Sequence, residues 1–366
     1  MNIGAEQIDQ LRLYRTESVG PITFHRLMQK YGSASEAIAA LPHIVKTKQV
    51  SVASRADAER EIDALEKLGG QMIFAGDDRY PLSLSAIEDA PAVLSVLGNL
   101  DLLQKQSVSI VGSRNASLNA RKLASKMARD LGEADFAVIS GLARGIDTAA
   151  HEGSLSSGTV AVVAGGVDII YPKENTDLYK KICENGAVIS ECALGMQPLA
   201  QHFPKRNRIV SGLSEGTVVV EANFRSGSLI TARMAAEQGR DVMAVPGFPS
   251  DPRSEGTNAL IRDGATMVRH AADVIEAVQS FLKEHVQRQT SLQGFAGLSD
   301  SAEIIEFPSA NIRDVILPEL STTPVGVDEI IRTCHLKSAE VQGLLLEMEL
   351  DGTIFRLPGN RICLAK

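Results

Sequence analysis

A succession of short apolar runs, each followed by a helical stretch, constrains the fold of this chain more than any other feature. The clearest runs are Val108–Gly112, Phe136–Gly141, Thr159–Gly165, Ala187–Glu191, Thr217–Ala222 and Asp241–Pro246, with a shorter one at Ala265–Val268. Helical stretches such as Leu118–Gly132, Asp177–Asn185 and Ser228–Gly239 separate them. This alternation predicts an α/β fold with a parallel sheet. Ligands of such sheets bind beyond the carboxyl ends of the strands, so the residues after each run are candidate site residues.

Helical and mixed segments flank this central block. Before it, Glu6–Leu41 has helical patterning that breaks near Gly20 and Gly32, and a further helix is predicted from about Ala53 to Leu68. After it, Val286–Glu306 is rich in Gln, Ser and Gly and has little periodicity, which is typical of a linker. Three helices and a hairpin follow and predict a winged helix-turn-helix: Ile312–Leu320, Val327–Cys334, Ser338–Leu350, Thr353–Leu357 and Arg361–Ala365.

The net charge of −8 is unevenly distributed. Residues 1–104 hold 14 acidic and 10 basic residues, whereas residues 105–283 hold 19 acidic and 20 basic residues. The central block is nearly neutral, so the positions of its basic residues decide whether it attracts nucleic acid. The four cysteines are scattered and lack zinc-ligand spacing, so we expect reduced thiols, no metal and no cofactor. No apolar run approaches membrane length and no signal pattern opens the chain, so we expect a cytoplasmic protein without membrane contact.

Two predicted strands end in glycine-arginine loops that open helices. The residues concerned are Gly112, Ser113 and Arg114 after the first run, and Gly141, Arg144 and Gly145 after the second. Glycine permits close approach of a ligand, a helix N-terminus favours an anion, and a guanidinium binds phosphate. The first loop is not G-x-G-x-x-G, which disfavours a dinucleotide site. We expect Asp147 to brace Arg144 or to cap the following helix.

The segment Phe203–Arg208 combines an aromatic ring with three cations within six residues. Its polar members are Lys205, Arg206, Asn207 and Arg208. This mixture suits a single nucleic-acid strand, because the cations neutralise phosphates while a base stacks on the ring. The alternative is a solvated basic turn with Phe203 buried.

Two further segments add anion-binding groups after predicted strands. Lys173 adds a cation in the Tyr171–Lys173 segment. Ser226, Gly227 and Ser228 open a helix and form a candidate anion nest. Glu221 has no second carboxylate as a partner, so we expect it to orient Arg206 or Arg208 rather than to catalyse a reaction.

Seven cations therefore follow strand ends: Arg114, Arg144, Lys173, Lys205, Arg206, Arg208 and Arg225. Their convergence predicts a local positive groove that binds single-stranded DNA without catalysis. The histidines His151, His202 and His270 lie far apart, with no nucleophile elbow or metal-ligand spacing. One alternative is a nucleotide phosphoribohydrolase of the lysine-decarboxylase-like group, although Pro246–Pro249 lacks the second glycine of that motif. Another is an interaction hub that a free nucleotide regulates.

The ordered motifs resemble those of the DNA-processing protein A family (DprA, also called Smf). They are Gly112–Arg114, Ser140–Asp147, Phe203–Arg208, Ser226–Ala232, and Val245–Gly247 with Gly256–Asn258. The resemblance implies an extended Rossmann-like sheet, preceded by a helical SAM-like or helix-hairpin-helix domain and followed by a winged-helix-like domain. It further implies binding of incoming single-stranded DNA in natural transformation, loading of the RecA recombinase, a homodimer, and no catalytic activity.

Carried to this chain, the resemblance assigns phosphate contacts to Arg114 and Lys173 and a base contact to Phe203. Lys205, Arg206 and Arg208 would flank Phe203, Ser226–Ser228 would form part of the phosphate pocket, and Arg144 and Glu221 would support it. We expect a helical domain over residues 1–75, the sheet domain over 76–283, a linker over 284–308 and the winged-helix-like domain over 309–366.

Two further expectations concern the C-terminal domain and the dimer interface. The predicted recognition helix Ser338–Leu350 contains three glutamates and no basic residue, so we expect it to contact protein rather than DNA. Its apolar stripe, Val341, Leu344, Leu345 and Met348, is expected to be core. We expect the dimer interface at Thr257–Arg262 and Ala272–Phe281.

Overall fold

The structure is a computed structural model of the 366-residue chain. It describes residues 3–44, 51–281, 312–321, 323–334, 338–357 and 360–365. The chain divides into two compact units, one of Met1–Ala58 with Leu292–Lys366 and one of Glu59–Ser291. The second, which we call the sheet unit, contains every candidate site residue. No helix in the described ranges is both long and apolar enough to cross a membrane.

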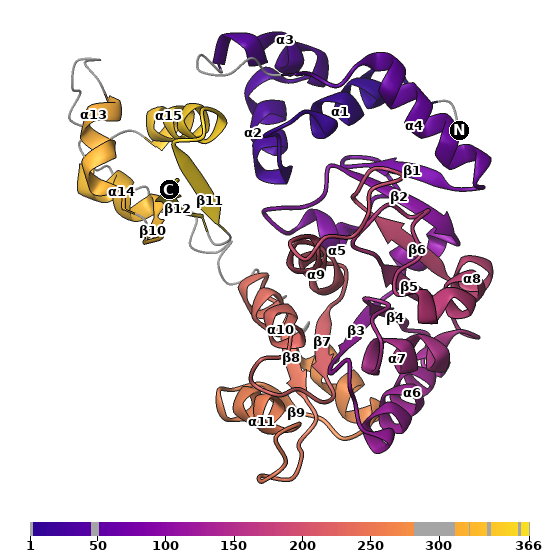
Figure 1. Ribbon diagram of the computed structural model, residues 1–366. Coiled ribbons are helices and arrows are strands. Elements are labelled where there is room, and N and C mark those ends of the chain that lie inside the picture. Colours follow the sequence, from indigo (N-terminus) through magenta and orange to yellow (C-terminus); the bar gives the residue numbers. More distant parts are fainter. Residues whose placement is uncertain are drawn as a thin grey trace. The chain divides into compact units, whose positions relative to one another are not determined.

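A nine-stranded sheet forms the sheet unit, in the order β1-β2-β6-β5-β4-β3-β7-β8-β9 (Figure 1). The strands are β1 Gln71–Phe74, β2 Val93–Gly98, β3 Ser107–Val111, β4 Ala137–Ser140, β5 Thr159–Val162, β6 Ala187–Ser190, β7 Gly216–Val219, β8 Asp241–Ala244 and β9 Thr266–Met267. β3 to β9 pair in parallel, which confirms the predicted α/β class. Each of the seven predicted runs overlaps one of these seven strands.

β1 and β2 are strands that the sequence analysis does not predict. They run antiparallel to each other, and β2 runs antiparallel to β6. β1 precedes residue 76, where we expected the sheet domain to begin, so the sheet reaches further toward the N-terminus. Its residues Met72, Ile73 and Phe74 are all buried, so no alternation of apolar and polar residues marks the strand.

Helices pack against both faces of the sheet. α6 (Leu118–Glu133), α7 (Ile146–Ser154) and the helix over residues 271–281 share one core with it. α5 (Leu82–Ser85), the 3-10 helix η1 (Leu100–Gln104), α9 (His202–Gly212) and α10 (Ser228–Glu237) share the other. Along β7 and the residue after it, Val218 and Val220 face the first core and Val219 faces the second, as the two-residue period of a strand requires. The remaining elements are the 3-10 helix η2 (Lys173–Asn175), α8 (Thr176–Asn185) and α11 (Glu255–Arg262).

The register of the central strands brings their carboxyl ends to one edge of the sheet. Val111 of β3 pairs with Val219 of β7, which pairs with Ala244 of β8. From β3 the chain builds outward through β4, β5 and β6 on one side, and through β7, β8 and β9 on the other. The strand order therefore reverses between β3 and β7, and such a reversal is where open α/β sheets bind their ligands.

The N-terminal helices are α1 (Ala5–Arg15), α2 (Pro21–Tyr31), α3 (Ala34–Ile44) and α4 (Arg55–Lys67). The predicted breaks are confirmed, because α2 begins with a proline after Gly20 and ends at Gly32 in the left-handed conformation. Leu11, Leu27 and Leu41 are fully buried. This segment is therefore a helical domain, as the sequence predicts.

The C-terminal segment is a winged-helix domain. Its helices are α13 (Ile312–Ile316), the 3-10 helix η3 (Leu317–Glu319), α14 (Val327–Cys334) and α15 (Ser338–Leu350), and its strands are β10 (Val325–Gly326), β11 (Ile354–Leu357) and β12 (Arg361–Leu364). β10 was not expected and completes a three-stranded sheet by pairing with β12. Val341, Leu345 and Met348 are buried in its core, as predicted. The predicted linker at 284–308 lies outside the described residues.

Two leucines of α6 offer a matched test of this architecture. Leu131 is fully buried, whereas Leu118 is 59% exposed. Leu131→Ala should lower the free energy of unfolding by about 2–5 kcal/mol, because it removes buried apolar contacts and leaves a cavity. Leu118→Ala should change it by less than about 0.5 kcal/mol. Urea unfolding of the full chain measures both, and equal effects of the two substitutions would contradict this packing.

Candidate nucleic-acid interface

Two adjoining cavities lie at the carboxyl ends of the parallel strands. Cavity 1, of about 590 Å³, is lined by the segments that follow β4 and β5 and by the first turns of α9. Cavity 2, of about 480 Å³, is lined by the segments that follow β3 and β7 and by α9 and α10. Arg114, Gly141, Ala143, Phe203 and Arg206 line both cavities. Cavity 2 lies at the reversal of strand order, where a ligand site is expected.

The Phe203–Arg208 motif lies on helix α9 and not on a turn. Phe203, Arg206, Asn207 and Val210 line cavity 2, and their spacing of i, i+3, i+4 and i+7 places them on one helical face. Lys205 is exposed and lines neither cavity. The helical phase therefore divides the motif, so that only part of it faces the cavities.

Arg208 does not point into either cavity, contrary to the expectation that it flanks the bound strand. Its side chain is buried and forms an ion pair with Glu191 and another, at 3.5 Å, with Asp89. It also donates a hydrogen bond to the carbonyl of Asp89. Because two carboxylates and a carbonyl hold this guanidinium, we assign Arg208 to the scaffold that positions α9.

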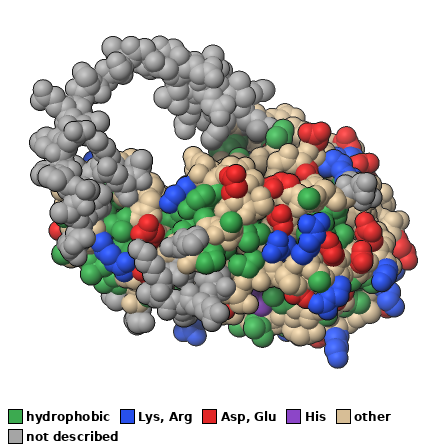
Figure 2. All heavy atoms as spheres, turned by 90° about the horizontal axis from the view of Figure 1, so that it is seen from above, with side chains coloured by type: hydrophobic (Ala, Val, Ile, Leu, Met, Phe, Trp, Pro, Cys, Tyr) green, Lys and Arg blue, Asp and Glu red, His purple; other side chains and the backbone are tan. Residues whose placement is uncertain are grey.

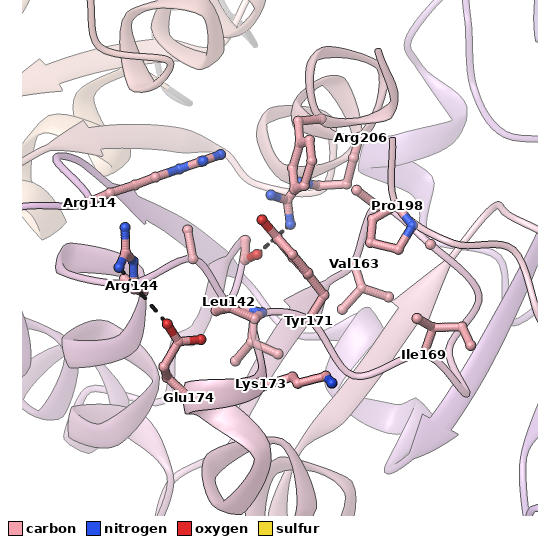
Figure 3. A pocket seen from close by; sticks show the side chains of 16 residues that line it. Arg114, Leu142, Arg144, Val163, Ile169, Tyr171, Lys173, Glu174, Pro198 and Arg206 are labelled. Carbon is pink, nitrogen blue, oxygen red and sulfur yellow. Dashed lines mark hydrogen bonds and ion pairs between the residues drawn. The ribbon is translucent and has the colours of Figure 1, made fainter. Parts of the chain in front are cut away.

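An aromatic and cationic cluster stands on the wall that the two cavities share. The guanidinium carbons of Arg114 and Arg206 lie 5.3 Å and 6.0 Å from the centre of the Phe203 ring, within the range of cation–π attraction. The Tyr171 ring lies 5.6 Å from the Phe203 ring. Figure 3 shows Arg114, Arg206 and Tyr171 directed toward the same space in cavity 1. The cluster offers aromatic faces beside positive charge.

Arg206 is buried and connects the ends of two strands. Its guanidinium donates hydrogen bonds to the carbonyls of Gly141 and Val162, at the carboxyl ends of β4 and β5. A Cβ atom on Gly141 would lie 2.7 Å from the Arg206 guanidinium, so the position of the arginine requires this glycine, which also lines both cavities. Burial lowers the pKa of Arg206 to about 10, and the group stays protonated at neutral pH.

Asp147 and His151 of α7 lie buried near Arg206. Asp147 accepts a hydrogen bond of 3.3 Å from the Ala143 amide, and burial raises its pKa to about 6 although the charge of Arg206 opposes this. Asp147 does not brace Arg144, which pairs instead with Glu174 at 3.9 Å (Figure 3). His151 bonds to the Thr159 hydroxyl at 2.8 Å, and burial lowers its pKa to about 3. His151 is therefore neutral and held in the core.

Glu221 fixes the start of α6 instead of orienting Arg206 or Arg208. Its carboxylate accepts a hydrogen bond of 3.1 Å from the amide of Ser117, the N-cap residue of α6. Its carbonyl accepts one of 2.7 Å from the Ser113 amide. These contacts tie the loop after β3 to the end of β7, so Glu221 is a positioning residue for the wall of cavity 2.

Gly145 allows the loops after β3 and β4 to pack closely against each other. It adopts a φ of +83°, and a Cβ atom there would lie 2.2 Å from the Ser113 carbonyl oxygen. That carbonyl also accepts a hydrogen bond from the Ile146 amide. Gly145 lines neither cavity, so the loops themselves require this glycine and a ligand does not.

Cavity 2 gathers anion-binding groups around the N-terminus of α10. Ser226, Gly227 and Ser228 line it, and the hydroxyls of the two serines lie 2.7 Å apart. Arg114, Arg225 and Arg253 also line it. An exposed helix N-terminus beside three guanidinium groups favours a phosphate. Arg253 lies between the Val245–Gly247 and Gly256–Asn258 motifs and was not among the predicted site residues.

The structure brings most of the predicted site residues together. Those that line one or both cavities are Gly112, Ser113, Arg114, Gly141, Arg144, Lys173, Phe203, Arg206, Asn207, Ser226, Gly227 and Ser228. Gly145, Lys205 and Arg208 do not. Acidic and basic side chains are interspersed over the face seen in Figure 2. The cations that line the cavities converge at a few strand ends, and such convergence favours a local positive potential. Among the described residues, no cluster of His, Cys, Asp and Glu is arranged to hold a metal ion.

Family models match three successive segments of the chain. The model of DNA recombination-mediator protein A matches residues 71–279. The DprA-like N-terminal HHH domain matches residues 4–64, and the DprA winged helix domain matches residues 305–360. The order of the three matches is the order of the helical domain, the sheet unit and the winged-helix domain.

Curated relatives and solved structures agree with these matches. The DNA processing protein DprA of Streptococcus pneumoniae is 48% identical over 201 residues, which span 54% of this chain and 71% of the relative. The X-ray structure of DprA from the same species gives a TM-score of 0.63 at 34% identity, over 75% of this chain and 98% of that one. DNA processing protein A from Helicobacter pylori, solved to describe its single-stranded DNA binding mode, gives 0.53 at 27% identity, over 59% and 96%.

Alanine substitution of two basic residues of α9 should change the stability of the protein to very different extents. Arg208→Ala removes the guanidinium that neutralises Glu191 and Asp89, and should lower the free energy of unfolding by about 3 kcal/mol. Lys205→Ala removes an exposed side chain and should change it by less than about 0.5 kcal/mol. Chemical denaturation of the full chain measures both effects. A small loss for Arg208→Ala would show that the ion pairs contribute little to the scaffold.

The buried carboxyl of Asp147 should give a specific pH dependence. Between about pH 4 and pH 6 the folded protein retains a proton on Asp147 that the unfolded chain has released, so the contribution of Asp147 to stability falls as pH rises. A pKa of about 6 instead of 3.8 corresponds to about 3 kcal/mol. The stability of the wild type relative to Asp147→Asn should therefore decrease by about this amount between pH 4 and pH 7. Urea unfolding at several pH values measures it, and a constant difference would refute the assignment.

Proposed function

The chain belongs to the DNA recombination-mediator protein A family, and on this premise we propose that cavities 1 and 2 bind single-stranded DNA. The strand lies along the carboxyl edge of the sheet and crosses the wall that the cavities share. The protein holds incoming DNA for the RecA recombinase during natural transformation. It acts as a homodimer in the cytoplasm and carries out no catalytic step.

The Phe203 cluster is the observation that carries this proposal. Its aromatic faces lie within 6.0 Å of two guanidinium groups, on a wall common to two cavities. Base stacking needs an open ring face, and the adjoining phosphates need cations. The cluster supplies both within the length of one nucleotide, and the N-terminus of α10 supplies a second phosphate site in cavity 2.

A single strand fits this arrangement better than a duplex. The Phe203 and Tyr171 rings line a cavity, so a base reaches them only when it is unstacked and turned away from its strand. In a duplex the bases are paired and stacked, and only phosphates meet the protein at such an edge. The solved relative from Helicobacter pylori, whose title describes single-stranded DNA binding, supports the same preference.

The carboxylates near the cavities support a binding function over a catalytic one. Asp147, which lines cavity 2, is bonded to the Ala143 amide, and Glu221 is bonded to the Ser117 amide. Glu174, which lines cavity 1, pairs with Arg144. A nucleotide-hydrolysing enzyme needs an acid or base directed at the reacting bond, whereas each of these carboxylates is engaged by a group of the protein.

Charge substitutions in the cavities should weaken DNA binding in a salt-dependent way. Arg114→Ala and Lys173→Ala should each weaken binding of labelled oligo-dT and reduce the slope of log affinity against log salt by about 0.7, the effect of one lost phosphate contact. Lys126→Ala is the matched control, because Lys126 lies on α6 and pairs with Asp130. Fluorescence anisotropy over a range of NaCl concentrations, with a duplex for comparison, measures these effects.

Equal binding by all variants, or tighter binding of the duplex, would refute the proposal. Absence of oligo-dT binding together with release of free base from a nucleotide would instead favour the phosphoribohydrolase alternative.

A further inference from the structure

The exposed aromatic side chains of the sheet unit are all found at one edge of the sheet. Among its described residues, three aromatic side chains are classed as exposed: Tyr171 at 47%, Phe224 at 65% and Phe248 at 73%. They follow β5, β7 and β8, whose carboxyl ends share the edge that carries the cavities. Exposing a phenylalanine to water is unfavourable by about 1.5–3 kcal/mol relative to burying it. Their common placement therefore indicates a ligand that covers them.

The loops that carry Phe224 and Phe248 lie beside each other and are held in place. The amide of Gly256, at the start of α11, donates a 2.8 Å hydrogen bond to the Ala222 carbonyl in the loop before α10. Asn258 bonds to both the amide and the carbonyl of Gly247, each at 3.1 Å. These bonds tie both loops to α11. Phe224 and Phe248 are thus presented by fixed loops, and their exposure is a property of the fold.

Both loops also contribute cations to cavity 2. Arg225, which directly follows Phe224, lines the cavity. Arg253, on the loop that carries Phe248, lines it as well. Ile230, 42% exposed, lines the cavity as well and adds apolar surface between charged groups. Each loop therefore carries one exposed ring and one guanidinium that lines cavity 2. The guanidinium of Arg253 also forms an ion pair with Asp251 of the same loop.

We propose that Phe224 and Phe248 stack bases of the bound strand and extend the single-stranded DNA site beyond cavity 2, toward the carboxyl end of β8. This inference rests on the proposed function and assigns its occupant as further nucleotides of the same strand. Alternating rings and guanidinium groups suit the alternating bases and phosphates of a single strand, and this surface continues directly from cavity 2.

Single tryptophans provide a direct test, because the chain contains no tryptophan. In the full chain, the fluorescence of Phe224→Trp and of Phe248→Trp should be quenched by oligo-dT, and the quenching should need longer oligomers than binding itself, over a series from roughly four to roughly sixteen nucleotides. Leu68→Trp is the control. Leu68 is 53% exposed and precedes β1, which runs in the direction of β6, so it lies at the opposite edge of the sheet. Its fluorescence should not change.

Alanine variants measure how much each ring contributes to the affinity for DNA. Phe224→Ala and Phe248→Ala should each weaken the binding of long oligo-dT by about five- to a hundredfold and leave short oligomers unaffected, whereas Leu68→Ala should weaken neither. If labelled oligo-dT binds and Arg114→Ala weakens its binding, but no quenching or loss occurs at Phe224 and Phe248, the inference is wrong while the proposed function stands. If no variant and no wild-type protein binds oligo-dT, both fail.

Discussion

The buried guanidinium of Arg206 is the contact on which the candidate site depends. It bonds to the carbonyls at the ends of β4 and β5 and approaches the face of Phe203. One side chain therefore fixes the separation of two strand ends, carries charge to the wall between the cavities and sets the position of the ring that we expect to meet a base. Its burial beside Asp147 is tolerable because hydrogen bonds and an opposite charge compensate for the lost water.

The polar residues of the strand ends divide into two groups by what they contact. Arg208, Glu221 and Asp147 are buried and satisfied by protein groups, so they fix α9 and the loops around it. Arg114, Lys173 and Arg225 are exposed and line cavities. The buried group gives the loops a fixed shape, and the exposed group gives the edge its local positive charge, although residues 105–283 as a whole are nearly neutral. Preorganisation of this kind lowers the entropic cost of binding a flexible strand.

Much of the fold follows from sequence patterns, while the directions of individual side chains do not. The parallel strands could be predicted because each apolar run is bounded by glycine or polar residues and followed by a helix. β1 and β2 escaped prediction because Met72, Ile73 and Phe74 of β1 are all buried and both strands depend on partners distant in sequence. The Phe203–Arg208 motif indicated the right region, but its helical phase was hidden by Pro204 and the cations. Arg208 points away from the cavities because Asp89 and Glu191 lie there, and only the folded chain brings them together.

On this interpretation, cavities 1 and 2 form one continuous site for a phosphodiester-linked strand. A double-mutant cycle between Lys173→Ala in cavity 1 and Arg225→Ala in cavity 2, with dTMP and oligo-dT as ligands, distinguishes one continuous site from two separate sites. Oligo-dT should bind far more tightly than dTMP, and both substitutions should weaken its binding because one strand contacts both residues. The two losses should add, because Lys173 and Arg225 contact different phosphates and do not interact with each other. If dTMP binds as tightly as oligo-dT, or if only one substitution affects the oligomer, the cavities are separate sites and the account is wrong.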